Sequence, residues 1–185
     1  MTNKKTVVLG VTGSIAAHKA VDLCGLLTKA GVDVHVVMTE AAQEFISPLP
    51  FKTLSKNPVI ASLYDEEEDW CPTHIQLANR ADLLLIAPAT ANTIAKLAVG
   101  LSGDALGCIA LALNPGARLI IAPALNDKMW QHPATQANVA TLTKRGARIV
   151  GPFEGELACG SEGLGRLAPI EDIAATALQA VGLAL

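Results

Sequence analysis

Residues 6–17 read TVVLGVTGSIAA, and this stretch decides the fold class that the rest of the chain must fit. Its first half is a short β-branched apolar run, which predicts a strand, and the Ala-rich second half opens a helix expected to reach about Lys29. Gly13 between them permits a tight turn, and Ser14 can cap the helix or bind an anion. The pattern is strand, glycine turn and helix.

The same turn leaves its role open. A full G-x-G-x-x-G pattern is absent, because Gly10 and Gly13 are followed by Ala16. A purely structural βα turn of a Rossmann-like domain and a phosphate-binding turn both fit these residues.

Alternation of strands and helices continues along the chain. Further strands are expected at 33–38, 82–86, 118–121 and 147–150, with a small strand or loop at 59–63. Helices are expected at 40–46, 51–56, 94–99, 105–113, 133–144 and 170–183, with a short one opening near His74. Of the 185 residues, 51% are hydrophobic but only 3% aromatic, which favours a core of Ala, Val, Leu and Ile. We therefore expect one α/β domain over residues 1–185, Rossmann-like or flavodoxin-like, with helices on both faces of a parallel sheet.

Small polar residues follow several of these strands. Thr39 comes after the second strand, Thr90 and Asn92 follow the third, and Asn126 follows the strand that Pro123 ends. In an open α/β sheet this carboxyl edge is where ligands bind. The alternatives are structural, since Thr39 and Thr90 are also good helix caps and an Asn-Asp pair is common in turns.

Two further side chains are candidates for chemistry. His74 has a side chain type that titrates near neutrality, although a lone histidine is more often structural. Cys159 lies in the glycine-rich residues 151–166, which suit a mobile flap, and the nearby Arg166 favours its thiolate. An incidental loop thiol is the alternative, whereas Cys24 and Cys108 are expected to be buried inside helices.

Composition argues against several classes of protein. A net charge of -3 and a pI near 5.8 give no basic surface for nucleic acid or an anionic membrane. Apolar runs fall short of the roughly 20 residues of a membrane span, and the first residues lack signal-peptide features, so we expect a cytoplasmic protein. The four cysteines show no C-x-x-C pairing, so neither a metal site nor a disulfide framework is expected.

Several segments together resemble one family, the homo-oligomeric flavin-containing cysteine decarboxylases. The likeness covers nearly the whole chain and is greatest to members that act on phosphopantothenoylcysteine in coenzyme A biosynthesis. It is carried by residues 13–17 (GSIAA), His74-Ile75, residues 87–92 (APATAN), residues 123–130 (PALNDKMW), residues 157–160 (LACG) and Gly165-Arg166.

The resemblance implies a cofactor, an assembly and a reaction. FMN is expected at the sheet edge, and the assembly is expected to be a homotrimer or a dodecamer of trimers with active sites at subunit contacts. Flavin oxidises the cysteinyl thiol to a thioaldehyde, the α-carboxylate is lost, and flavin reduces the resulting enethiol to the saturated product. The residues expected to bind FMN are Gly13, Ser14, Ile15, Thr39, Pro88, Thr90 and Asn92.

Catalytic roles are also implied by the resemblance. His74 matches the histidine beside the flavin, and Asn126 matches the asparagine that binds the substrate carboxylate. Cys159 matches the cysteine that donates a proton during enethiol reduction, under a flap that excludes water. Met129 and Arg166 are further expected substrate contacts.

The chain departs from the family pattern at two places. Leu125 replaces a methionine, a swap that preserves volume and apolar character. Residues 101–105 read LSGDA where the family has an Ala-Asp-Asp-like stretch, which affects contacts expected from that loop. The sequence ends at Leu185 without the fused ligase domain of many bacterial versions, so a separate ligase is expected to supply the substrate.

Three other functions fit the residues. A lantibiotic-type peptidyl-cysteine decarboxylase releases the unreduced enethiol and does not need Cys159. A prenyl-FMN synthase-like transferase needs no thiol substrate. A noncatalytic FMN-binding regulatory subunit binds flavin without turnover.

Overall fold

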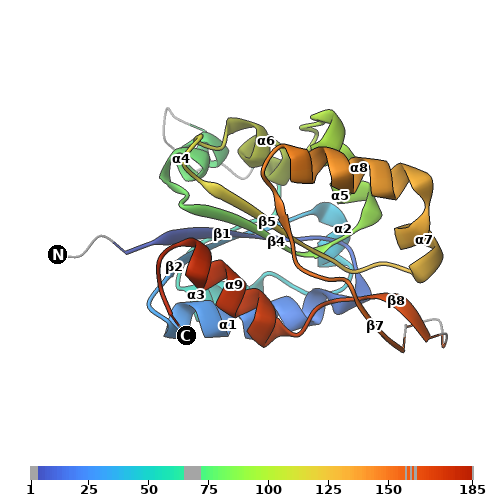
Figure 1. Cartoon of the computed structure of the whole chain (residues 1–185). Coiled ribbons are helices and arrows are strands. Elements are labelled where there is room, and N and C mark those ends of the chain that lie inside the picture. The colour runs from blue at the N-terminus through green and yellow to red at the C-terminus, as the bar shows by residue number, and fades with distance from the viewer. Residues whose placement is uncertain (1–3, 65–71, 157, 159, 161, 185) are drawn as a thin grey trace.

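The central sheet of the protein is wholly parallel. The computed structural model describes residues 4–64, 72–156, 158, 160 and 162–184. Six strands pair in the order β3-β2-β1-β4-β5-β6. They are β1 (Thr6–Val11), β2 (Asp33–Met38), β3 (Val59–Ile60), β4 (Leu83–Ala89), β5 (Arg118–Pro123) and β6 (Arg148–Ile149). Figure 1 shows β2, β1, β4 and β5 between the helices. The strands β1 and β4 are buried along their whole length, as continuous apolar runs predict for strands covered on both faces.

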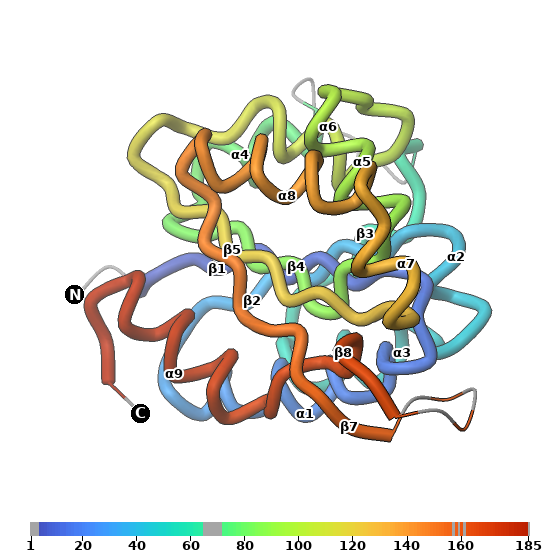
Figure 2. The backbone as a smooth tube through the Cα atoms, turned by 45° about the vertical axis from the view of Figure 1, so that its right-hand side comes forward, coloured from blue at the N-terminus to red at the C-terminus, as the bar shows by residue number. Residues whose placement is uncertain are grey.

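Helices cover both faces of this sheet, which Figure 2 shows as two layers. Alternate strand residues divide between two cores: Val7 and Leu9 face one, and Val8 faces the other. The first core lies under α1 (Lys19–Lys29), α3 (Leu49–Ser55) and α9 (Ile170–Ala180). The second lies under α4 (Thr73–Arg80), α5 (Ala91–Val99), α6 (Ala105–Ala112) and α8 (Pro133–Lys144). Gly10 lets α6 approach β1 closely, because a Cβ there would lie 2.6 Å from Leu106 Cδ1.

The predicted fold class is confirmed, and the strand order locates its ligand crevice. The strand order reverses at β1. The chain first adds β2 and β3 on one side of β1 and then adds β4, β5 and β6 on its other side. In doubly wound sheets the crevice outside the carboxyl ends of such strands is the usual ligand site. Gly13 and Ser14 follow β1, while Thr90 follows β4 and Asn92 lies in the first turn of α5, so both predicted groups lie at this point.

Several local features differ from the predictions. The helix after Ser14 begins as a 3-10 turn, η1 (Ile15–His18), and α2 (Glu40–Gln43) is shorter than expected. A helix, α7 (Asp127–Gln131), follows Asn126, where the Asn-Asp pair indicates a turn. The predicted flap contains an antiparallel hairpin of β7 (Phe153–Glu156) and β8 (Glu162–Arg166), which the sequence did not indicate because its exposed strands carry no apolar alternation. Cys24 is buried as expected, but Cys108 is only half-buried.

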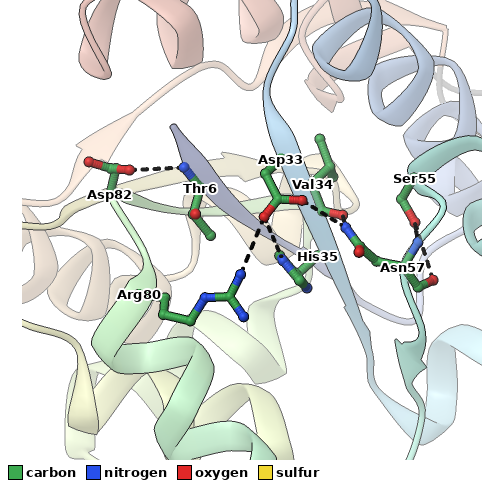
Figure 3. A network of polar contacts seen from close by, with 8 residues as sticks. All are labelled: Thr6, Asp33, Val34, His35, Ser55, Asn57, Arg80 and Asp82. Carbon is green, nitrogen blue, oxygen red and sulfur yellow. Dashed lines mark hydrogen bonds and ion pairs between the residues drawn. The ribbon is translucent and has the colours of Figure 1, made fainter. Parts of the chain in front are cut away.

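A polar network closes the opposite, amino edge of the sheet (Figure 3). The Asp33 carboxylate accepts hydrogen bonds from Asn57 Nδ2 at 2.9 Å and contacts His35 Nε2 at 3.0 Å and Arg80 Nη2 at 3.5 Å. Partial burial acts to raise the pKa of Asp33, but the Asn57 and His35 hydrogen bonds and the Arg80 charge hold that pKa below its usual value. His35 therefore has a structural role, on the face of β2 beside Asp33.

No helix among the described residues combines the length and the apolar character needed to cross a lipid bilayer.

Candidate functional site

A buried threonine joins the two turns of the crevice. Thr12 is 1% exposed, and its hydroxyl donates a hydrogen bond to the Pro88 carbonyl at 2.7 Å. The same oxygen accepts one from Thr90 N at 3.1 Å. The N–H of Thr39 donates a hydrogen bond to the carbonyl of Val11 at 3.0 Å, which holds the turn after β2 beside the other two turns. Three loops of distant sequence are thereby fixed side by side.

These loops enclose a cavity of about 530 Å³, called here the first cavity. Its volume lies in the range of cofactor sites. The predicted FMN residues Gly13, Ser14, Thr39, Thr90 and Asn92 all line it, together with the predicted substrate contact Met129. The other lining residues are Glu40, Ala41, Ala91, Thr93, Lys96, Gly103, Asp104, Ala124 and Leu125.

The hydroxyls at this cavity also cap helices. Ser14 Oγ accepts from Ala16 N at 3.3 Å, Thr39 Oγ1 from Ala42 N at 3.3 Å and Thr90 Oγ1 from Thr93 N at 3.3 Å. These three residues therefore both cap helices and line the cavity, so the two roles are compatible. A Cβ at Gly13 would lie 2.6 Å from Ala41 Cβ, so the turn after β1 packs directly against α2. The wall there presents main chain and small polar groups, which suits a nucleotide.

A second cavity of about 480 Å³ adjoins the first and shares Ser14, Ala124 and Leu125 with it. It contains the predicted residues Ile15, Asn126 and Arg166, and its further lining residues are Ala16, His18, Lys19, Glu156, Ala158, Gly165 and Leu167. Lys19 and Arg166 bring positive charge to it and Glu156 brings one negative charge, so a net positive charge remains, which suits an anionic ligand.

Asn126 is held where the two cavities meet the hairpin. Its Oδ1 accepts from Lys128 N at 3.0 Å and so caps α7. The preceding residue, Leu125, donates its N–H to the Gly165 carbonyl at 3.0 Å. Gly165 has no room for a side chain, because a Cβ there would overlap the Leu125 carbonyl oxygen. The hairpin thus packs main chain to main chain against the segment that carries Asn126.

Two predicted site residues, Pro88 and His74, lie elsewhere, and a third is not among the described residues. Pro88 is buried in β4 and reaches the site only through its carbonyl contact with Thr12. His74 is half-buried in the first turn of α4 and lines neither cavity. Cys159 lies outside the described residues, although Ala158 lines the second cavity.

Two further residues build the site, and the sequence does not single them out. Thr12 belongs to the predicted turn, and only its hydrogen bonds to a segment 76 to 78 residues away reveal its role. Lys96 belongs to the helix predicted at 94–99. Its distance of four residues from Asn92 was an available signal, because residues so spaced share one helix face.

Fold and site define the class: a doubly wound α/β protein with two adjoining cavities at the reversal of its strand order. The comparison with family models then gives the family. The chain belongs to the Flavoprotein family, whose model matches residues 1–182.

Individual relatives agree with this assignment. A probable phosphopantothenoylcysteine decarboxylase from Streptococcus mutans is 47% identical over 169 residues, covering 91% of this chain and 94% of the relative. The coenzyme A biosynthesis bifunctional protein CoaBC of Haemophilus influenzae is 44% identical over 92% of this chain, which spans 42% of that longer protein.

Solved structures show the same similarity. A mutant PPC decarboxylase complexed with pantothenoylaminoethenethiol superimposes with a TM-score of 0.84 at 33% identity, covering 94% of this chain and 96% of the other. The FMN-binding protein AtHal3 superimposes with a TM-score of 0.81 at 34% identity, covering 94% and 95%. The family predicted from sequence is therefore confirmed.

Proposed function

We propose that the protein catalyses the FMN-dependent decarboxylation of phosphopantothenoylcysteine to phosphopantetheine in coenzyme A biosynthesis. The observation that carries this proposal is the pair of adjoining cavities at the strand-order reversal, which share Ser14, Ala124 and Leu125. The first is lined by most of the expected FMN residues together with Met129, and the second by the expected substrate residues Asn126 and Arg166 together with Ile15. A redox cofactor and a thiol substrate need such adjacency to exchange electrons.

The first cavity fits a flavin nucleotide by the chemistry of its lining. Gly13, Ser14 and the cap of α2 supply main-chain and hydroxyl groups for a phosphate, while Thr90 and Asn92 supply hydrogen-bonding groups for a heterocycle. Bound flavin would supply the chemistry of taking two electrons from the substrate thiol and returning them after carbon dioxide is lost. Membership of the Flavoprotein family supports the flavin, and FMN is the form we propose.

The second cavity fits an acidic substrate. The Asn126 amide at its wall carries donors suited to the carboxylate that leaves, and Lys19 with Arg166 supplies positive charge for a substrate phosphate. A peptide that ends in cysteine has the carboxylate but no phosphate and would gain less from these charges, so this cavity favours phosphopantothenoylcysteine over the lantibiotic-type alternative. We assign Cys159 the donation of a proton to the enethiol, and the hairpin the exclusion of water.

In this proposal, the catalytic role of His74 depends on the assembly of several subunits. Within one chain it lines neither cavity, and both views place α4 away from the β7–β8 hairpin (Figures 1 and 2). We propose that His74 acts in the site of a neighbouring subunit of a homotrimer, or of a dodecamer of trimers. The protein would work in the cytoplasm and receive its substrate from a ligase.

The proposal is tested by the absorbance spectrum of the purified protein and by carbon dioxide release from two substrates. We expect a bound flavin spectrum and release from phosphopantothenoylcysteine that is at least about tenfold faster than from a peptide ending in cysteine, a difference of one charge-assisted contact. Faster release from the peptide would favour the lantibiotic-type enzyme. Bound flavin without release would favour a prenyl-transfer or regulatory role, and absence of flavin would contradict the cofactor assignment.

A further inference from the structure

Lys96 has a distinct position in the first cavity. Among the described residues that line this cavity, it is the one that carries a positive charge, and Glu40 and Asp104 carry negative charges. Lys96 lies three and four residues after Thr93 and Asn92, which also line the cavity, so all three share one face of α5. This face is a different wall from the Gly13-Ser14 turn.

Asp104 fixes the Lys96 ammonium group. Asp104 Oδ2 accepts from Lys96 Nζ at 2.9 Å, and Asp104 Oδ1 accepts from Gly107 N at 2.8 Å as the cap of α6. The loop before Asp104 also packs tightly on α6, because a Cβ at Gly107 would lie 2.7 Å from the Leu101 carbonyl oxygen. Asp104 is anchored by its own helix, so it holds the lysine at the cavity wall. The loop that departs from the family pattern thus retains a carboxylate with a defined task.

We propose that Lys96, positioned by Asp104, stabilises the negative charge that a bound flavin gains on reduction. This inference rests on flavin binding in the first cavity, as proposed above. Two electrons and one proton taken up from the substrate thiol leave the flavin with one negative charge more than the oxidised form. A cation at a partly buried wall favours that anion more strongly than it would in water. The phosphate has the separate Gly13-Ser14 turn, so the lysine is available to the ring.

The test is the reduction potential of FMN bound to the full-length protein. Lys96→Met should weaken binding of reduced relative to oxidised FMN by about tenfold, which for a two-electron couple lowers the potential by about 30 mV. Asp104→Asn should raise the potential, because it removes a negative charge from the cavity wall, while Lys96 stays on the cavity-lining face of α5 and asparagine still caps α6. Lys96→Arg should keep the potential close to that of the original protein. Lys144→Met, which removes an exposed charge on α8 outside both cavities, is the control.

Opposite shifts in Lys96→Met and Asp104→Asn would support the inference, because simple loss of structure moves both the same way. An unchanged potential in Lys96→Met would overturn it. Weaker binding of FMN but not of riboflavin, with the potential unchanged, would show a phosphate contact instead. Absence of flavin from the original protein would contradict the proposed function and this inference with it, whereas bound flavin with an unchanged potential overturns the inference alone.

Discussion

Thr12 accepts a hydrogen bond from the main-chain N–H of Thr90 at 3.1 Å, across the point where the strand order of the sheet reverses. Its hydroxyl donates a hydrogen bond to the Pro88 carbonyl oxygen at 2.7 Å. One buried side chain therefore sets the spacing between the turn after β1 and the turn after β4, which form two walls of the first cavity.

Replacing Thr12 by valine should loosen these walls. Thr12→Val keeps the shape but leaves the Thr90 N–H and the Pro88 carbonyl without this partner, so we expect a loss of about 2 kcal/mol in the free energy of unfolding and weaker FMN retention. Denaturant unfolding and flavin content after gel filtration measure the two effects. Thr141→Val, which removes an exposed helix hydroxyl, should change neither; equal effects in both variants would contradict the assigned role.

Gly165 should be intolerant of a side chain. Gly165→Ala forces its Cβ against the Leu125 carbonyl, so the hairpin must shift away from the Asn126 segment. A displacement of about 1 Å can cost about a hundredfold in rate, and we expect such a fall in kcat/KM with flavin content unchanged. Gly116→Ala is the control, because nothing lies within 4 Å of a Cβ there. Full activity of Gly165→Ala would show that the hairpin contact is dispensable.

Asn126 can be tested apart from its capping role. Asp and Asn cap helices about equally well. The free energy of unfolding of Asn126→Asp should therefore lie within about 0.5 kcal/mol of that of the original protein, whereas Asn126→Ala should lower it by about 1 kcal/mol. Both should lose at least about a hundredfold in turnover, since a carboxylate repels the substrate carboxylate and alanine cannot bind it. If turnover followed stability, with Asp active and Ala not, Asn126 would be only a cap.

The subunit-crossing role of His74 has a mixing test. His74→Asn and Asn126→Asp should each be inactive alone, but oligomers formed by refolding the two together should recover a fraction of the activity. Recovery occurs because some sites then combine an intact His74 from one subunit with an intact Asn126 from another. A site built within one chain would carry a defect in every subunit, and mixing would restore nothing.

Acidification should reduce the contribution of the polar network at the amino edge of the sheet to the free energy of unfolding. Because the folded pKa of Asp33 is lowered, its carboxylate contributes stability above its unfolded pKa of about 3.9, and this contribution is lost as the pH falls through the folded pKa. Asp33→Asn should lower the free energy of unfolding by about 1–2 kcal/mol at pH 7. On acidification, the free energy of unfolding of this variant should fall less than that of the original protein. Urea unfolding between pH 7 and pH 3 measures this. A pH dependence in Asp33→Asn that runs parallel to that of the original protein would contradict the assignment.

The fold was predictable because burial leaves a pattern in the sequence. Apolar runs such as 83–86 mark strands covered on both faces, and caps such as Thr39 and Thr90 mark the helices between them. The β7–β8 hairpin left no such pattern, because its strands are largely exposed and rich in glycine.

The site was predictable where it depends on strand ends, and not where it depends on distant partners. Carboxyl ends of parallel strands share one edge, which predicts that Ser14, Thr39, Thr90 and Asn92 lie near one another, and all four line the first cavity. The pairing of Lys96 with Asp104 spans a loop whose path no local pattern specifies. His74 stays a prediction, since its partners in this account belong to another subunit.

The mass of the product formed under anaerobic conditions tests the central claim most directly. The purified protein would be mixed with phosphopantothenoylcysteine, and the product of complete turnover analysed by mass spectrometry. Our account predicts a product that is lighter than the substrate by one carbon dioxide and saturated, because the flavin returns both electrons to the enethiol. A product that lacks two further hydrogens, or an unchanged substrate beside bound flavin, would contradict it.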